Sequence, residues 1–153
     1  MMVACCAFVL ASCHTTAEKQ SMHFFSLKYF FEQESIRLAK AKQHVDKSVS
    51  HNGSFERKNS FIQDWKNELN MFTESDINKP AWRDSYRVVE DSGRISYQAL
   101  DSKLRTRSIV IKEDIAGKPT QIDIINKTHN LLYQSREHLR YVPDSIYSID
   151  KKQ

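Results

Sequence analysis

The positions of the glycines are the feature that most constrains the fold of this chain. The 153-residue sequence holds three of them, Gly53, Gly93 and Gly117. Each lies where the surrounding alternation of apolar and polar residues independently requires a turn. Asn52-Gly53 is the strongest short-range signal for a β-hairpin, because both residues accept a positive φ. The pattern predicts a meandering antiparallel sheet and leaves no glycine for a glycine-rich phosphate-binding loop.

Two helices are expected in the first half of the chain, with a hairpin between them. The first covers residues 26–42, with Ser26 as its N-cap. The second covers residues 60–73, where Ser60 and Gln63 fit a capping box. Helical spacing defines one apolar face on each. These faces are formed by Phe24, Leu27, Phe31 and Leu38 in the first helix, and by Phe61, Trp65, Leu69 and Phe72 in the second.

After a connector at residues 74–84, which Pro80 interrupts, the sequence predicts strands alone. The expected strands cover residues 86–89, 95–99, 104–113, 121–126, 131–134, 139–142 and 146–149. The sheet needs one face covered, and the aromatic sides of the helices are suited to this. The expected fold is therefore α+β: two N-terminal helices with an intervening β-hairpin, packed on a five- to six-strand antiparallel meander sheet.

The first thirteen residues form an uncharged, largely apolar segment that ends in small residues. All the cysteines of the chain lie in this segment, at Cys5, Cys6 and Cys13. A short apolar run that closes on small residues is typical of an export signal. The alternative is an ordinary buried N-terminal strand or helix that holds cysteines.

The tetrad Leu10-Ala11-Ser12-Cys13 resembles the lipobox of bacterial lipoproteins. This resemblance implies a signal peptide at residues 1–12, cleavage before Cys13, and lipidation of Cys13. Residues 13–23 would then form a lipidated tether, and residues 24–153 a single α+β domain. Several acyl chains bury enough methylene groups for stable anchoring.

Residues 76–86 and 103–108 resemble an uncharacterised family of Gram-negative-type lipoproteins, which offers no activity to transfer. The residue after the anchored cysteine is His14, whereas an aspartate there would resemble an inner-membrane retention signal. The resemblance therefore implies a lipid-anchored protein of the cell envelope, in the outer membrane and facing the periplasm or the cell surface.

Charge and motifs argue against several classes of function. The formal net charge is +4, and basic and acidic residues are interspersed. Without a dense basic stripe, nucleic acid is not an expected partner. No cysteine lies beyond Cys13, and the histidines have no zinc-type spacing, so we expect no metal and no cofactor. The chain has no G-x-S-x-G motif, so we expect no catalytic residues and no enzymatic activity.

Two short stretches supply the candidate ligand-binding residues. Arg105 and Arg107 are expected on the strand face that continues into Ile109 and Ile111. That arrangement suits a groove mouth that holds a carboxylate or phosphate. The alternatives are ion pairs with acidic residues of the chain, or a bulge that changes the register. The internal partners considered are Asp84, Glu90 and Asp101.

The second stretch is the connector that contains Trp82. This residue either caps a pocket or plugs the end of the core. Tyr97 belongs to a set of sheet tyrosines that suits a recognition surface as well as a sheet face.

Three functions remain open at this point. The first is a non-catalytic envelope domain that binds a protein or small-molecule partner. The second is a periplasmic carrier or chaperone that shelters an apolar ligand between sheet and helices. The third is a hydrolase of envelope polymers. The expected membrane contact is through the lipid anchor, and the sequence leaves the oligomeric state open.

Overall fold

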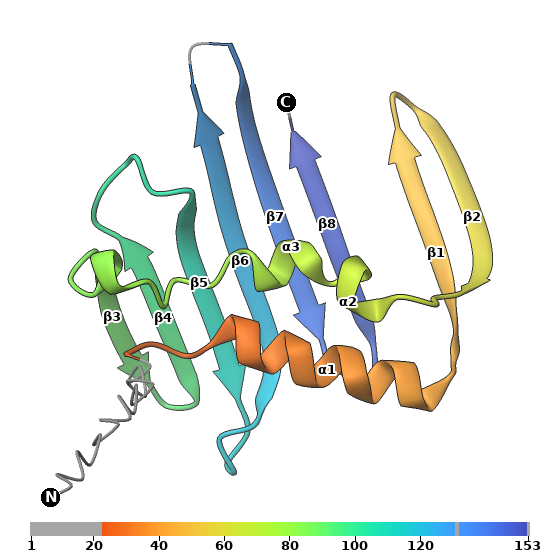
Figure 1. The fold of residues 1–153 in the computed structure, drawn as a ribbon, viewed down its shortest axis with the longest axis horizontal. Helices are drawn as coiled ribbons and strands as arrows, with labels where there is room; N and C mark the ends of the chain where they lie inside the picture. Colours follow the sequence, from red (N-terminus) through yellow and green to blue (C-terminus); the bar gives the residue numbers. More distant parts are fainter. Residues whose placement is uncertain (1–22, 131, 153) are drawn as a thin grey trace, which may run out of the picture.

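The computed structural model describes residues 23–130 and 132–152, and its main body is a six-stranded antiparallel sheet (Figure 1). Each strand pairs with its neighbour in the sequence, in the order β3-β4-β5-β6-β7-β8. The strands are β3 (Tyr86–Asp91), β4 (Arg94–Ala99), β5 (Thr106–Glu113), β6 (Pro119–His129), β7 (Gln134–Val142) and β8 (Ile146–Lys152). The α+β class and the meander sheet are confirmed. The predicted signal peptide and Cys13 lie outside the described residues.

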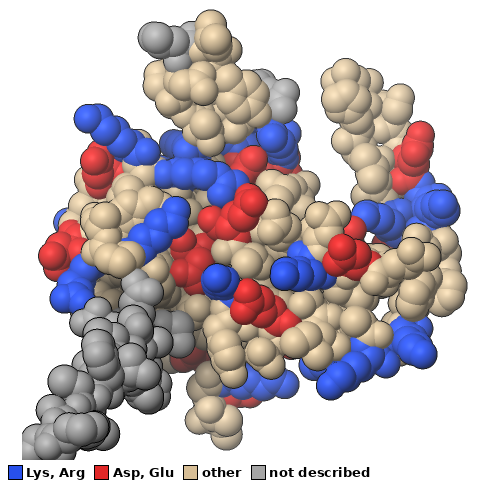
Figure 2. Space-filling view, in the orientation of Figure 1, with Lys and Arg blue, Asp and Glu red and all other residues tan. Residues whose placement is uncertain are grey.

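The helices of the described residues all lie across the same face of this sheet (Figure 1). They are α1 (Leu27–Ala41), α2 (Trp65–Glu68), α3 (Asn70–Thr73) and the 3-10 helix η1 (Pro80–Trp82). The predicted cap of α1 is confirmed, because Ser26 Oγ accepts a hydrogen bond from the Tyr29 N–H at 3.1 Å. Figure 2 shows basic and acidic side chains interspersed on this helix-covered face.

The hydrophobic core fills the space between the helices and the inner face of the sheet. Its buried aromatic residues come mainly from the helical side, and its isoleucines come mainly from β5 and β6. The members are Phe24, Leu27, Phe31, Ile62, Trp65, Leu69, Phe72, Ile77, Tyr86, Tyr97, Ala99, Ile109, Ile111, Ile122, Ile124, Leu139 and Tyr141. Burial of this apolar surface is the main driving force for folding.

The predicted start of the second helix, at Ser60, is wrong. Ser60 and Phe61 belong to strand β2 (Ser54–Phe61), and Phe61 is exposed. The N-cap is Asp64 instead, and its Oδ1 accepts a hydrogen bond from the Asn67 N–H at 2.9 Å. The apparent capping box therefore belongs to a strand, and the helical segment begins at Trp65.

The helical segment is also divided, because it breaks at Leu69 between α2 and α3. Asparagines at positions 67 and 70 have low helix propensity, which is consistent with two short helices in place of a single long one. Trp65 and Phe72 are nevertheless buried, as their spacing predicts. The apolar residues were thus assigned correctly to the core, although the element that carries them is shorter.

A separate two-stranded sheet is formed by β1 (His44–His51) and β2. Its turn contains Asn52 at φ 47° and Gly53 at φ 81°, which confirms the predicted hairpin. In Figure 1 the hairpin stands beyond β8, apart from the large sheet. Lys47 of β1 connects the hairpin to α2 through an ion pair, in which its Nζ atom lies 2.7 Å from Glu68 Oε1.

The predicted strands at 121–126, 131–134 and 139–142 are in fact two long strands, β6 and β7. Polar residues at 126–129 and 135–138 lie within the ladder, so the alternation of apolar residues underestimates the strand length. The turn between β3 and β4 requires its glycine. Gly93 has φ 73°, and a Cβ atom there would lie 3.0 Å from the carbonyl oxygen of Glu113.

The chain enters the domain through a hydrogen-bonded contact that we call the Asn78 clamp. Asn78 Oδ1 accepts from the Phe24 N–H at 3.0 Å, and its Nδ2 donates to the carbonyls of Phe24 and Phe25, both at 3.2 Å. The Phe24 ring packs edge-on against Tyr86 and Tyr97. The start of the domain is therefore fixed to the connector and to the sheet.

Candidate functional site

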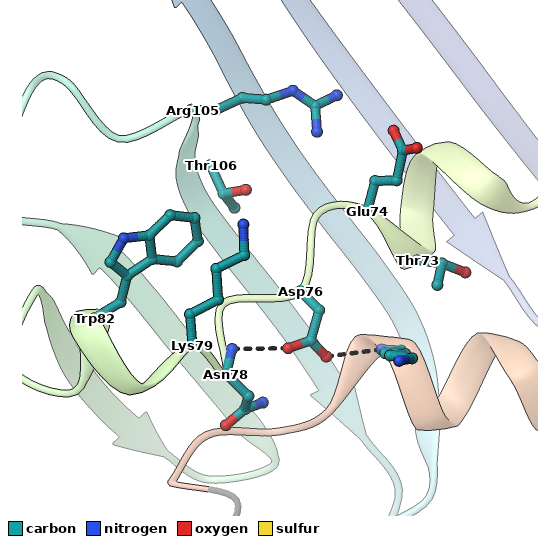
Figure 3. Close-up of a pocket in the computed structure, with 9 residues that line it drawn as sticks. Thr73, Glu74, Asp76, Asn78, Lys79, Trp82, Arg105 and Thr106 are labelled. Carbon is teal, nitrogen blue, oxygen red and sulfur yellow. Dashed lines mark hydrogen bonds between the residues drawn. The ribbon is translucent and has the colours of Figure 1, made fainter.

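A pocket of about 540 Å³ opens between the start of α1, the end of α3, the connector and the start of β5 (Figure 3). Most of the residues that line it have a polar or charged side chain. The lining residues are Lys28, Thr73, Glu74, Asp76, Asn78, Lys79, Trp82, Arg105 and Thr106. Segments far apart in the sequence therefore meet here, and the two stretches that the sequence indicates for ligand binding both contribute.

Asp76 forms the frame of the pocket. Its carboxylate accepts hydrogen bonds from Ser26 Oγ at 3.2 Å, from the Lys28 N–H at 2.7 Å and from the Asn78 N–H at 2.7 Å. The Ser26 and Lys28 contacts place its negative charge at the N-terminus of α1, where the helix dipole favours an anion. Both oxygens of Asp76 are thus used to join α1 to the connector, and its role is structural.

Trp82 and Lys79 form one wall of the pocket. Pro80 begins the 3-10 helix η1, and the Trp82 N–H donates to the Lys79 carbonyl at 2.9 Å. Lys79 Nζ lies 4.1 Å from the centre of the indole ring, within the range of a cation–π contact. In Figure 3 both side chains extend along the same side of the pocket. The wall therefore combines a flat aromatic surface with a positive charge.

Arg105 lies directly before β5, on another side of the pocket. One guanidinium nitrogen donates to Glu137 Oε2 at 2.9 Å. The Glu137 side chain is 8% exposed, whereas that of Arg105 is 34% exposed. The pair therefore has a buried carboxylate and a partly solvated cation, and Lys151 Nζ lies 3.5 Å from the other Glu137 oxygen.

A buried polar cluster lies behind this side of the pocket. Thr106 Oγ1 donates to the Ser75 carbonyl at 3.2 Å, and Asn126 Nδ2 donates to Ser75 Oγ at 2.9 Å. Tyr86 OH donates to the Thr106 carbonyl, and burial raises its pKa to about 12. Most buried polar groups in folded proteins are hydrogen-bonded. Within the described residues, the side-chain oxygen of Asn126 is a buried atom without such a partner.

The expected common face of Arg105, Arg107, Ile109 and Ile111 is wrong. A register shift lies between Thr106 and Ser108, so Thr106 and not Arg107 shares the buried face with the isoleucines. The Arg107 guanidinium donates to the backbone carbonyl of Asp101. Of the alternatives that the sequence left open, the bulge is present. Arg105 also has an internal acidic partner, but this partner is Glu137 and not one of the predicted residues Asp84, Glu90 and Asp101.

The structure brings Trp82 and Arg105 to the same pocket, but it does not bring Arg107 or Tyr97 there. Tyr97 is buried in the core, where its hydroxyl accepts a hydrogen bond from the Phe25 N–H at 3.1 Å. Burial also raises the pKa of this hydroxyl.

Sequence reasoning missed Lys28, Thr73 and Glu74, which reach the pocket only through the packing of α1 and α3 on the sheet. In the sequence, Lys28 looks like an ordinary exposed residue of a helix, and Glu74 looks like an ordinary polar residue of the connector. No local pattern indicates that they lie close to each other, so a tertiary structure is needed to find them.

Within residues 23–130 and 132–152, no cluster of three or more His, Cys, Asp and Glu side chains has a geometry suited to a metal ion. None of the helices that the structure describes has the length and apolar character needed to cross a membrane. Comparisons with protein-family models, with curated proteins and with solved structures return no significant match.

Proposed function

We propose that this chain is a lipid-anchored lipoprotein of the bacterial envelope, sorted to the outer membrane, whose domain at residues 24–153 is a non-catalytic ligand-binding module. The observation that carries the binding role is the pocket in which the Lys79–Trp82 wall faces Arg105. The lipobox tetrad and the confinement of cysteine to the first thirteen residues support the anchor.

The charges of the pocket indicate an anionic ligand. Lys28, Lys79 and Arg105 line it together with Glu74 and Asp76. Both oxygens of Asp76 are used within the protein, and Glu74 Oε1 accepts from Asn70 Nδ2 at 2.8 Å. Arg105 is already paired with Glu137, but Lys28 and Lys79 form no ion pair with a residue that the structure describes, so their charges remain available to an anionic ligand.

The flat aromatic surface of Trp82 indicates that the ligand also has a planar apolar part. A ligand that carries a carboxylate and an aromatic ring would place the ring on Trp82 and the carboxylate between the cations. The volume of about 540 Å³ lies within the usual range for small-molecule pockets. We therefore propose small aromatic carboxylates as the ligand class.

The fluorescence of Trp82 provides the test. Trp65 and Trp82 are the tryptophans of the chain, so Trp65→Phe leaves Trp82 as the reporter. We expect millimolar benzoate to change its emission, and benzamide, which has the same ring without the charge, to have a much smaller effect. Lys79→Gln should weaken the benzoate response several-fold, whereas Arg107→Ala, outside the pocket, should not. Equal responses to benzoate and benzamide would contradict the proposal.

The anchor is tested separately. Cells that express the full chain are labelled with palmitate and fractionated. We expect label in the wild-type protein and none in Cys13→Ser, because the thiol is the group that accepts the lipid. Persistent labelling or persistent membrane fractionation of Cys13→Ser would contradict the anchor and leave the binding proposal untouched.

The carrier alternative has less support than the anionic-ligand proposal, because every residue that lines the pocket except Trp82 has a polar or charged side chain. For a hydrolase, a carboxyl group with a raised pKa would be the expected acid. The two carboxyl groups with a resolved shift, Glu34 and Asp123, both have a lowered pKa, because hydrogen bonds from cations outweigh the effect of burial.

A further inference from the structure

The face of the large sheet opposite the helices carries an excess of positive charge. We call it the outer face and define it by the residues that alternate with the buried ones on β3 to β8. Its cations are Arg87, Arg94, Lys112, Lys127, Arg136, Arg140 and Lys152, and its carboxylates are Asp91, Asp123 and Asp150. All these Lys and Arg residues are exposed.

The cations of the outer face lie directly opposite one another. Lys127 pairs with Arg136 across β6 and β7, and Arg136 pairs with Lys152 across β7 and β8. Arg94 and Lys112 form a second such pair across β4 and β5. Directly opposed side chains are about 5 Å apart at Cβ, and like charges in this position destabilise a sheet. The arrangement therefore has a cost that the fold itself does not require.

Three of these cations have no ion pair among the described residues, whereas Arg94 lies directly opposite Asp91 across β3 and β4. None of Lys127, Arg136 and Lys152 forms an ion pair with a residue that the structure describes. By contrast, Asp123 on the same face lies 2.7 Å from Arg140 Nε, and this hydrogen bond helps to lower its pKa despite burial. The charge of Asp123 is thus neutralised by Arg140, whereas Lys127, Arg136 and Lys152 are not neutralised by an ion pair with any residue that the structure describes.

We propose that the outer face docks on an anionic membrane surface, with its Lys and Arg side chains bound to the phosphates of phospholipid headgroups. The cations occur on every strand from β3 to β8, a span of about 24 Å at the usual strand spacing. A broad and even array of this kind matches a plane of charge, whereas a linear polymer is more often bound along a groove. Juxtamembrane cations are attracted by anionic leaflets.

The proposed anchor would hold the outer face within reach of such a surface, and this argument alone rests on the proposed function. His23 follows Cys13 by ten positions in the sequence, which is a reach of about 35 Å at full extension. The domain would therefore stay close to the membrane that holds its lipid, and weak headgroup contacts would be sufficient to orient it.

The test uses the full chain with Cys13→Ser, so that no acyl chain contributes to binding. Vesicles of phosphatidylcholine alone are compared with vesicles that contain one third phosphatidylglycerol, in a sedimentation assay at low and physiological salt. We expect binding to the anionic vesicles that falls as salt rises. The triple variant Lys127→Gln, Arg136→Gln, Lys152→Gln should bind them at least about tenfold more weakly.

A matched control has the same change in net charge elsewhere. Lys40→Gln, Lys58→Gln, Lys66→Gln removes three exposed cations away from the outer face and should retain vesicle binding. The outer-face variant should also be no less stable to urea than the parent, because it removes repulsion between opposed like charges.

Equal binding by the two triple variants would overturn the proposal, and so would equal binding to neutral and anionic vesicles. Binding of soluble polyphosphate without binding of anionic vesicles would also overturn it, and would assign the face to a linear polyanion. None of these outcomes depends on the pocket or on lipidation of Cys13.

Discussion

Arg105 and Arg107 are two residues apart, yet their surroundings differ because a bulge separates them. Arg105 donates to the buried carboxylate of Glu137, whereas Arg107 donates to an exposed backbone carbonyl. Removal of a partner from a buried charged group costs far more than removal from a solvated one. The two arginines should therefore respond differently to the same substitution.

We expect Arg105→Ala to lower the free energy of unfolding by about 1–3 kcal/mol, because the Glu137 carboxylate loses a hydrogen bond while Lys151 still lies near it. The cost stays below that of a fully buried pair because the Arg105 side chain is 34% exposed. Arg107→Ala is the control and should cost less than about 0.5 kcal/mol. Urea denaturation measures both, and equal losses would contradict this assignment.

The bulge also limits what sequence can predict about the candidate site. The alternation of side chains in a strand predicts their faces only while the register is regular. One extra residue after Thr106 reverses the predicted face of Thr106 and of the residues before it. The connector tryptophan was identified because an aromatic residue between elements is conspicuous. No sequence feature distinguishes Lys28 and Glu74, which also line the pocket, because their positions there depend on how the helices pack.

At the scale of elements, helix α2 is short and depends on the side chain of Trp65 for its attachment to the body. This ring is 5% exposed and packs edge-on against Tyr147, with centroids 6.2 Å apart. A four-residue helix has no stability of its own in water, so tertiary packing must hold it in place.

We expect Trp65→Ala to lower the free energy of unfolding by about 3–5 kcal/mol, as is usual for a large aromatic residue removed from a core. Trp82→Ala provides a comparison at a partly exposed position and should cost clearly less. Chemical denaturation followed by circular dichroism measures both. A loss below about 1 kcal/mol for Trp65→Ala would show that α2 does not pack as described.

The elements that sequence predicted well are those whose signal is local. The cap at Ser26 and the turn at Asn52-Gly53 depend on residues that are adjacent in the chain, and both are confirmed. The helix at 60–73 was overestimated because Phe61 and Ser60 fit a helical pattern equally well. Pairing with β1 places these two residues in a strand. The sequence of this segment alone does not show that strand pairing competes with helix formation here.

At the scale of the whole molecule, acid should weaken the fold through two carboxyl groups. Burial opposes ionisation of Glu34 and Asp123, but hydrogen bonds from Arg37 and Arg140 outweigh it and lower both pKa values. A carboxyl group with a lower pKa in the folded state stabilises the fold above its unfolded pKa, near pH 4. This stability is lost as the pH falls through the lowered values.

Alkali should weaken the fold through four tyrosines. Burial is the first cause that raises the pKa values of Tyr86, Tyr97, Tyr141 and Tyr147, and for Tyr86 the pKa is about 12. Stability from these groups is fully present below their unfolded pKa, near pH 10, and is lost as the pH rises further.

We therefore expect these six groups to add almost no slope to the unfolding free energy between about pH 5 and pH 9, with losses on both sides. Urea denaturation across the pH range measures this. Glu34→Gln should flatten the acid side, and Tyr141→Phe should flatten the alkaline side. A variant that leaves its side unchanged would show that its group does not contribute.

The Asn78 clamp has a mechanical consequence. Any pull on the chain before residue 24 reaches the domain first at Phe24, whose backbone is bound to Asn78 and whose ring is held between Tyr86 and Tyr97. Asn78 lies in the connector, which Asp76 joins to the start of α1. A force applied at the N-terminus is thus distributed over the first helix, the connector and the edge of the sheet. The domain should therefore resist stepwise unfolding from this end.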